Sequence, residues 1–416
     1  MRYSILSLAS QAWRGHRGWP QAWRDPAPKA AYDVVIVGGG GHGLATAYYL
    51  AAEHGITDVA VLEKGWIGGG NTGRNTTVVR SNYFYPQSAA LYDLALRLYE
   101  GLSRTLNYNI MLSQRGMVVL SHSRHDLELA RRAANAMRLN GVDAELLTVD
   151  DVARMIPALD VGPAARFPVL GGLVQARAGT ARHDAVAWGY ARAADARGVD
   201  IIQNCEVTGF RRGADGAITA IDTSRGTIGA RRVALTVAGH SGVLAGLAGF
   251  RLPIASHALQ AMVTEPVKPV LDTVVLSPAT GMYLSQSDKG ELVIGGGLDH
   301  HLSYGQRGTP AVAHGVLAAV AEQFPAFGRL RLLRQWAGIV DVVADSSPII
   351  GASPVPNLLL NCGWGTGGFK AIPAGGTLLA HHLATGAPHP IAAPFGLHRF
   401  ASGALIDEAG AAGIAH

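Results

Sequence analysis

A glycine loop between a short apolar run and a helical segment constrains the fold of this 416-residue chain more than any other feature. Gly38, Gly40 and Gly43 form the pattern G-x-G-x-x-G, directly after the β-rich run Tyr32–Val37 and before the predicted helix Leu44–Glu53. In such a unit the first glycine makes a tight turn, and the second admits a pyrophosphate to the backbone. The third lets the helix pack on the strand. Amide groups at the helix N-terminus attract the diphosphate, so the pattern predicts a Rossmann-type dinucleotide site.

An acidic residue 20 positions after Gly43 strengthens this prediction. Glu63 follows a second apolar strand, Val59–Leu62, where a carboxylate accepts hydrogen bonds from ribose hydroxyls. The same carboxylate disfavours a 2′-phosphate, so NADP is not expected. Gly41 and His42, inside the glycine loop, are further residues that we expect to contact the cofactor.

Two further segments favour FAD over NAD. The polar stretch Asn71–Thr77 stands where a nicotinamide enzyme would continue with regular strand–helix repeats. Near the C-terminus, the strand Leu358–Asn361 runs into a second glycine-rich loop, Gly363–Gly368, before another helix. Both ends of the chain would then clamp the dinucleotide, as in FAD folds. The expected FAD contacts are completed by Asn71, Thr76, Thr77, Val78, Val207, Gly365, Gly368 and Lys370.

The chain length suits two interleaved domains, and 48% hydrophobic with 16% charged residues supports a large core. From about Ile254 to Leu298, strands alternate with turn residues, as in an antiparallel sheet. The expected fold is therefore α/β, with a Rossmann-type FAD-binding domain interleaved with an α+β substrate domain on an antiparallel sheet. We expect an arm at 1–31, FAD-binding parts at 32–95, 166–250 and 336–416 (with the C-terminal tail), and substrate parts at 96–165 and 251–335.

Composition also excludes several classes of partner. The net charge of +5 comes from scattered basic residues without a Lys/Arg stripe, so nucleic acid is not expected. No run reaches about 18 uninterrupted apolar residues, so no membrane span is expected. The apolar stretch after Met1-Arg2-Tyr3 is too short for an export signal. Cys205 and Cys362 are too far apart for a metal cluster, which fits a cytoplasmic protein.

Three segments carry a resemblance to a known family: Arg74–Tyr83, Arg182-His183-Asp184 before a helix, and Asn361–Lys370 with the sequence NCGWGTGGFK. Together with Gly38–Gly43 and Glu63, they make the chain resemble the glycine/D-amino-acid oxidase family over essentially its whole length. More closely, it resembles the β subunits of heterotetrameric sarcosine oxidases. The resemblance implies a glutathione-reductase-like FAD domain joined to an antiparallel substrate domain.

The resemblance also implies cofactors and partners. FAD is expected to be noncovalent, and a second flavin, FMN, is expected to be bonded covalently to His183 beside Arg182. The implied partners are α, γ and δ subunits, and NAD and folate would belong to these partners, chiefly to the α subunit. Monomeric relatives attach FAD to a cysteine near the position of Gly338, where this chain has none. Cys362 and Cys205 are therefore expected to be core residues.

Arg80 and Lys370 are the candidate substrate-binding residues. A planar guanidinium and an ammonium both suit an amino-acid carboxylate, and the resemblance places both residues on it. We expect Lys370 in the loop that closes the flavin site; a structural ion pair is the alternative for Arg80. Tyr283, on a predicted strand, is expected to line the pocket, although an ordinary sheet aromatic fits equally well.

The resemblance implies oxidative demethylation of sarcosine to glycine and formaldehyde, with formaldehyde passed to folate in a partner and oxygen reduced to hydrogen peroxide at FMN. Two alternatives stay open: oxidation of another small amine, such as dimethylglycine, proline or a D-amino acid, and a non-catalytic flavin-binding subunit. In the arm, Trp13, Trp19 and Trp23 predict contact with a neighbouring surface, either of this chain or of a partner subunit.

Overall fold

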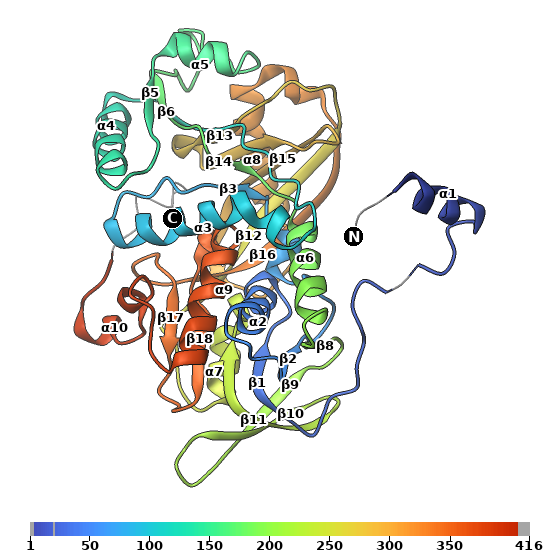
Figure 1. Ribbon diagram of the computed structural model, residues 1–416. Helices are drawn as coiled ribbons and strands as arrows, with labels where there is room; N and C mark the ends of the chain where they lie inside the picture. The colour runs from blue at the N-terminus through green and yellow to red at the C-terminus, as the bar shows by residue number, and fades with distance from the viewer. Residues whose placement is uncertain (1–3, 20, 407–416) are drawn as a thin grey trace.

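The computed structural model describes residues 4–19 and 21–406. The start of the predicted arm (1–3), position 20 and the end of the predicted tail (407–416) lie outside the described residues. Two large sheets dominate the fold, one in the lower part of Figure 1 and one in the upper part. The chain passes repeatedly between them, because each sheet takes strands from early, middle and late segments. The mixed α/β fold with two sheets is as predicted, whereas the predicted domain boundaries stay a prediction.

The first sheet has the strand order β17-β18-β11-β1-β2-β8, with β10 and β9 continuing from β11. Its centre is parallel, because β1 pairs in parallel with β2 and β11, β2 with β8, and β11 with β18. The strands are β1 (Ala31–Val37), β2 (Val59–Leu62), β8 (Asp200–Ile202), β9 (Val207–Arg212), β10 (Ile218–Thr223), β11 (Gly226–Leu235), β17 (Ile349–Ala352) and β18 (Leu358–Cys362).

The central strand β1 is buried on both faces. Val34 and Ile36 pack into a core cluster with the helices on one side, whereas Val35 and Val37 pack into a second cluster on the other. Successive strand side chains point to opposite faces, so a continuous apolar run is what a covered parallel strand requires.

Helices pack on both large sheets and carry several site residues. The longest are α2 (Gly41–Glu53), α3 (Pro86–Thr105), α4 (Arg124–Leu139), α6 (His183–Asp195), α8 (Pro310–Gln323) and α9 (Gly368–Thr385). The shorter ones are α1 (Ile5–Trp13), α5 (Val149–Met155), α7 (Ser241–Leu247) and α10 (Arg399–Ser402). The helix α2 begins at Gly41 rather than at the predicted Leu44, because the Leu44 amide already donates to the Gly40 carbonyl at 3.0 Å. A capping box formed by Thr148 and Asp151 begins α5.

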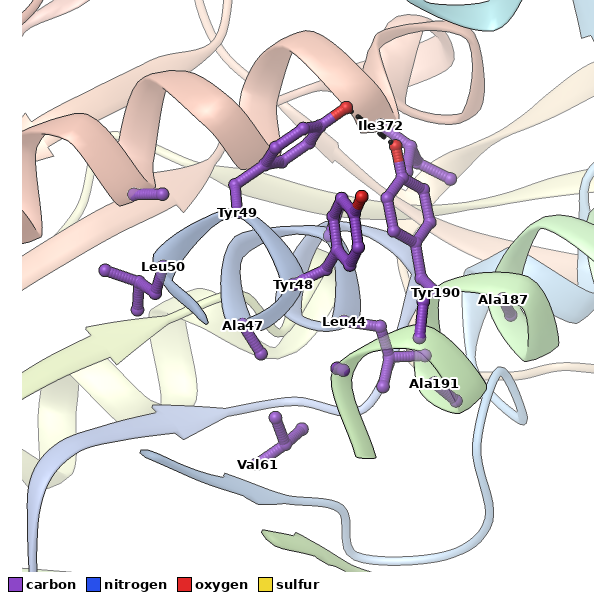
Figure 2. Packing of buried hydrophobic residues seen from close by; sticks show 14 of the residues in the cluster. Leu44, Ala47, Tyr48, Tyr49, Leu50, Val61, Ala187, Tyr190, Ala191 and Ile372 are labelled. Carbon is purple, nitrogen blue, oxygen red and sulfur yellow. Dashed lines mark hydrogen bonds between the residues drawn. The ribbon is translucent and has the colours of Figure 1, made fainter. Parts of the chain in front are cut away.

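A cluster of tyrosines joins α2 to α6 (Figure 2). The ring of Tyr190 lies 5.6 Å from that of Tyr48 and 6.0 Å from that of Tyr49, between ring centroids. The hydroxyls of Tyr49 and Tyr190 are 3.2 Å apart, so each buried phenol has a hydrogen-bond partner. The cluster fixes α6, which begins at His183, against the helix that follows the glycine loop.

The second sheet has the order β16-β12-β15-β14-β13-β4-β6-β5. It was predicted to be antiparallel and is so except between β13 and β4, which run parallel. These two strands are far apart in the chain, and only strands joined by a long crossover can pair in parallel. The strands are β4 (Met117–Ser121), β5 (Glu145–Leu147), β6 (Gly171–Gln175), β12 (Ala255–Pro266), β13 (Val274–Ser277), β14 (Met282–Gln286), β15 (Glu291–Leu302) and β16 (Leu332–Val342).

A small two-stranded sheet lies beside the two large ones. It pairs β3 (Val78–Val79) with β7 (Gly179–Thr180) in antiparallel fashion. Short 3₁₀ turns, among them η1 (Asn71–Arg74), η2 (Ala238–His240) and η5 (Gly365–Gly367), shape the loops around the site. Over the described residues, none of the helices has the length and apolarity needed to cross a bilayer.

The three tryptophans of the N-terminal arm differ in how much of each side chain is covered. Trp23 packs against the helix-side core, whereas Trp19 is 48% exposed and Trp13 is 94% exposed. The helix α1 buries none of its residues (Figure 1). Contact of Trp13 and Trp19 with a partner stays a prediction.

Candidate active site

A cavity of about 880 Å³ opens between the two sheets. Val37, Leu62 and Thr236 line it at the carboxyl ends of β1, β2 and β11, where ligands bind in open parallel sheets. Leu259 and Gly338 line it from the second sheet. The predicted site residues that line the cavity are Gly38, Gly40, Gly41, His42, Glu63, Asn71, Thr76, Thr77, Val78, Arg80, Val207, Tyr283, Gly365, Gly368 and Lys370.

Gly43 lies under the cavity rather than in its wall. A Cβ atom there would lie 2.0 Å from the Gly38 carbonyl oxygen and 2.7 Å from Oγ1 of Thr236. Helix α2 and the loop therefore approach each other too closely for any side chain. Thr236, which sequence reasoning missed, donates to the carbonyls of Val37 at 2.9 Å and Gly38 at 3.1 Å. Thr236 follows β11, and nothing in the sequence shows that β11 pairs with β1.

Glu63 is held at the end of β2 by two backbone amides. Its Oε2 accepts from the Gly39 amide and its Oε1 from the Gly65 amide, each at 2.9 Å. Each carboxylate oxygen has two lone pairs, so each can still accept a hydroxyl hydrogen. This arrangement suits the ribose of a dinucleotide.

The polar stretch after β2 forms one side wall of the cavity. The Asn71 Oδ1 accepts from the Ile339 amide at 2.8 Å, which ties η1 to β16. Thr77 has a φ of +67°, a conformation in which a β-branched residue is strained. Its carbonyl accepts from the Ala181 amide at 3.0 Å, so the cavity wall is bonded to the segment that leads into α6.

His42 joins the first glycine loop to the second. Its ring stacks on Trp364 with centroids 4.6 Å apart, and its Nε2 lies 2.9 Å from the carbonyl oxygen of Gly368. Burial lowers the pKa of His42 to about 4, although the hydrogen bond to Gly368 opposes this, so the ring is neutral near pH 7. Because a carbonyl only accepts, Nε2 carries the proton.

Asp341, another residue that sequence reasoning missed, lines the cavity from β16. Its side chain is buried, and its Oδ2 accepts from the Gly363 amide at 2.6 Å. Burial raises the pKa of Asp341 to about 6, against hydrogen bonds from the amides of Gly363, Trp364 and Gly365. No sequence motif marks it, because the residues that it binds lie more than 20 positions later.

Arg80 and Lys370 both line the cavity, and the charge of Arg80 acts on Lys370. Both are buried, each with 5% exposure, although Arg80 directly follows β3 and Lys370 lies in α9, far apart in the chain. Lys370 lies in the first turn of α9 rather than in the predicted loop, and its Nζ donates to the Thr366 carbonyl at 2.9 Å. Burial lowers the pKa of Lys370 well below 10.5, and the charge of Arg80 lowers it further. The positive charge of Lys370 is therefore disfavoured while the site is empty, and an anion between the two side chains would stabilise the charges of both.

Arg80 also contacts protein groups. Its guanidinium donates to Oδ1 of Asn82 and lies over the ring of Tyr83, 5.0 Å from the centroid. Tyr283 lines the cavity from β14 and shares a hydrogen bond with Thr76. Burial raises the pKa of Tyr283, despite that hydrogen bond, so its phenol stays neutral near pH 7.

His183 and Arg182 lie outside the lining of the cavity, on its flank. His183 is the first residue of α6, and its Nδ1 is buried with no hydrogen-bond partner. Burial lowers the pKa of His183, with Asp184 acting against this and Arg182 reinforcing it. Arg182 binds Asp184 through Nε to Oδ1 at 3.0 Å.

The lining fits an extended dinucleotide. A glycine loop, an amide-held carboxylate and a polar wall lead to a pair of buried cations. A model of the FAD dependent oxidoreductase family matches residues 33–382. The chain belongs to this family. FAD dependence is therefore shown, and the cavity is where this oxidoreductase would hold its flavin.

Similar proteins extend the comparison. The chain is 55% identical over 416 residues to "Sarcosine oxidase subunit beta" of Rhodobacter capsulatus, covering 100% of both chains. It is 54% identical over 394 residues to the protein of that name from Arthrobacter sp, covering 95% of this chain and 97% of the relative. Among solved structures, L-proline dehydrogenase from P. horikoshii superposes with a TM-score of 0.85 at 25% identity, over 91% of this chain and 100% of that one. Glycine oxidase from Geobacillus kaustophilus has a TM-score of 0.80 at 23% identity, covering 89% and 99%, and shows the fold alone.

Proposed function

We propose that this oxidoreductase carries out the oxidative demethylation of sarcosine to glycine and formaldehyde, with oxygen reduced to hydrogen peroxide. The observation that carries the proposal is the convergence of Arg80 and Lys370 on the cavity that begins at the glycine loop. Two buried basic side chains favour one small anion, such as an amino-acid carboxylate. The relatives named sarcosine oxidase subunit beta support the choice of substrate.

FAD, when bound, would supply the two-electron acceptor for oxidation of the C–N bond. The chain's own residues bind and orient. Gly40 and Gly41 leave room for the diphosphate, and Glu63 would accept from the ribose. Arg80 and Lys370 would hold the substrate carboxylate, so that the N-methyl group has a fixed direction. Tyr283, a neutral phenol, would form another part of the cavity wall.

The conversion of the substrate needs no protein acid or base whose protonation state differs between the beginning and the end of the reaction. The neutral secondary amine loses a hydride equivalent from its methyl carbon and the proton from its nitrogen, which water accepts, and becomes an imine. Water adds to the imine, and the C–N bond breaks to give glycine and formaldehyde. In the assembled enzyme, formaldehyde would instead pass to folate in a partner subunit.

We also propose that His183 carries FMN covalently, with Arg182 beside it, while FAD stays noncovalent. The buried, unpartnered Nδ1 and the lowered pKa of His183 support this, because an unprotonated ring nitrogen is needed to bond a flavin. The hydrogen bond from Ala181 to Thr77 supports the placement, because it links this flank to the wall of the FAD cavity. Noncovalent FAD is supported by the glycine at position 338, because this position in the cavity lining offers no thiol for attachment.

The name "subunit beta" of the relatives supports assembly with other chains. We propose α, γ and δ subunits as these partners, with NAD and folate bound outside this chain. We also propose a cytoplasmic location, which the free cysteines support.

The deciding experiment is an anaerobic titration of the holoenzyme followed through the visible absorption of FAD. Sarcosine should bleach the flavin within the mixing time, and one equivalent each of glycine and formaldehyde should form. Dimethylglycine, L-proline and D-alanine serve as comparison substrates. If one of these compounds bleaches the flavin faster than sarcosine does, that compound is the better substrate. If neither sarcosine nor any comparison compound bleaches the flavin, the result favours a non-catalytic flavin-binding subunit.

A further inference from the structure

The loop that precedes Lys370 is wrapped around a carboxylate. Gly363 has a φ of +70°, Trp364 a φ of −75° and Gly365 a φ of +51°. Alternation of left- and right-handed residues turns successive amides toward one point and makes an anion-binding nest. The anion in this nest is Asp341, which accepts from the Gly363 amide at 2.6 Å and from the amides of Trp364 and Gly365.

The nest is connected to the substrate end of the cavity in two steps. The residue after the nest, Thr366, accepts from Nζ of Lys370 at 2.9 Å. Inside the nest, Trp364 stacks on His42, which is hydrogen-bonded to the start of α9 at Gly368. A displacement of the nest would therefore move the carbonyl that holds the Lys370 ammonium.

Asp341 is also part of the cavity wall. Its buried charge would act on a bound flavin directly, because fields in a buried site are poorly screened by solvent. Its pKa of about 6 leaves it ionised at pH 8.

We propose that Asp341 is a positioning residue, which fixes the Gly363–Gly365 nest and through it Lys370, and which places a negative charge beside the flavin. The proposal rests on the proposed role of Lys370 in carboxylate binding. Its test uses no turnover of sarcosine, so its failure can be told apart from the failure of the proposed substrate.

The test compares Asp341→Asn with the wild-type enzyme at pH 8. The variant keeps the shape of the side chain but has one acceptor oxygen instead of two and no negative charge, so it holds the amides of the nest more weakly. Asp299→Asn is the matched control, because Asp299 is a buried carboxylate of the same sheet that accepts from Gln260 at 2.7 Å. Asp299 lies outside the lining of the cavity.

Three readouts are expected to change in Asp341→Asn and not in Asp299→Asn. In the flavin-free protein, amide hydrogen exchange of Gly363–Gly365 should become faster. In the FAD-bound protein, methoxyacetate, titrated through the flavin difference spectrum, should bind at least roughly tenfold more weakly. The flavin midpoint potential should become more positive, because loss of a nearby negative charge favours the reduced, anionic flavin.

Unchanged exchange, affinity and potential in Asp341→Asn would overturn the proposal, and so would equal changes in the Asp299 control. If Asp341→Asn does not fold, Gly365→Ala tests the nest from its other side. A Cβ atom at Gly365 has open space, but its φ of +51° makes alanine strained. Gly365→Ala should then weaken methoxyacetate binding, and wild-type affinity in this variant would contradict the proposal.

Discussion

The hydroxyl of Tyr99 donates to the carbonyl oxygen of Phe369 at 2.7 Å. In an ordinary helix this carbonyl would accept from the amide four residues later, but that residue is Pro373, which has no N–H. Tyr99 of α3 therefore supplies the hydrogen bond that α9 lacks, one residue before Lys370.

Removal of this hydroxyl should destabilise the protein. In Tyr99→Phe the Phe369 carbonyl is left without its donor, at a cost of about 1–3 kcal/mol. Urea denaturation of the FAD-free protein measures the loss. In Tyr99→Phe combined with Pro373→Ala, the new amide can donate to Phe369, so part of the stability should return. An equal loss in the single and double variants would mean that the hydroxyl stabilises α9 in another way.

Arg80→Met and Lys370→Met should each weaken binding of a small carboxylate. Each change keeps the apolar stem and removes a charge, and a charge-assisted hydrogen bond contributes about 1.5–3 kcal/mol, or roughly ten- to a hundredfold in affinity. Titration of methoxyacetate against the FAD spectrum measures the effect. Lys289→Met, at an exposed position outside the cavity, is the control. The carboxylate role would be excluded by wild-type affinity in both site variants.

Gly40→Val should fold but fail to retain FAD. Gly40 lines the cavity with a φ of −80°, which any residue can adopt. The close neighbour of a Cβ atom at this position is Oγ1 of Thr72, at 3.2 Å, so the protein itself has room for the atom. The methyl groups of valine would instead occupy the space that the diphosphate needs. Purified protein should have a wild-type circular dichroism spectrum and no flavin absorbance. A yellow variant with full FAD content contradicts the placement of the diphosphate.

His183→Asn should abolish covalent flavin while FAD stays extractable. The change removes the ring nitrogen that would bond FMN and keeps a polar side chain. Intact-mass spectrometry should find an FMN-sized addition in the wild-type enzyme, assembled with its partners, and none in the variant. His382→Asn is the control, because His382 also has a buried Nδ1 without a partner. An addition that survives His183→Asn would assign the attachment to another residue.

Deletion of residues 1–19 should weaken assembly with partner subunits without loss of FAD. The described part of this segment includes α1, whose Ile5, Leu6 and Trp13 are 81%, 78% and 94% exposed. Exposed apolar side chains of this kind are typical of interfaces. The deletion spares Trp23, which packs on the core. Co-purification of tagged partners measures assembly, and normal yields would exclude the arm as an anchor.

The sequence predicted the parts of the site that depend on local spacing. The glycine loop, β2 and Glu63 follow one another within 30 residues, so their arrangement can be read from the chain itself. Thr236 and Asp341 could not be found in this way, because parallel pairing of β11 with β1 and the return of the chain at Gly363 bring them to the cavity. The positions of Thr236 and Asp341 at the cavity depend on contacts between segments that are far apart in the chain.

Lys370 illustrates a different failure of local reasoning. Glycine is a poor helix former, so the stretch up to Lys370 was expected to be a loop. The helix α9 nevertheless begins at Gly368, because it packs along α2 and α3. At Gly376 a Cβ atom would lie 2.5 Å from that of Ala45, so the glycines of α9 are required for the close approach of the two helices. Tertiary packing outweighs propensity here.

The lining of the cavity extends along the chain from Val37 to Ile372. During synthesis, a nascent chain that ends before β18 would contain the glycine loop and Glu63 but neither the Asp341 nest nor Lys370. Such a chain could meet FAD only at a half-built surface open to water. Cofactor uptake should therefore follow the emergence of β18 and α9 from the ribosome, and a shortage of flavin would leave the unloaded polypeptide as the target of proteolysis.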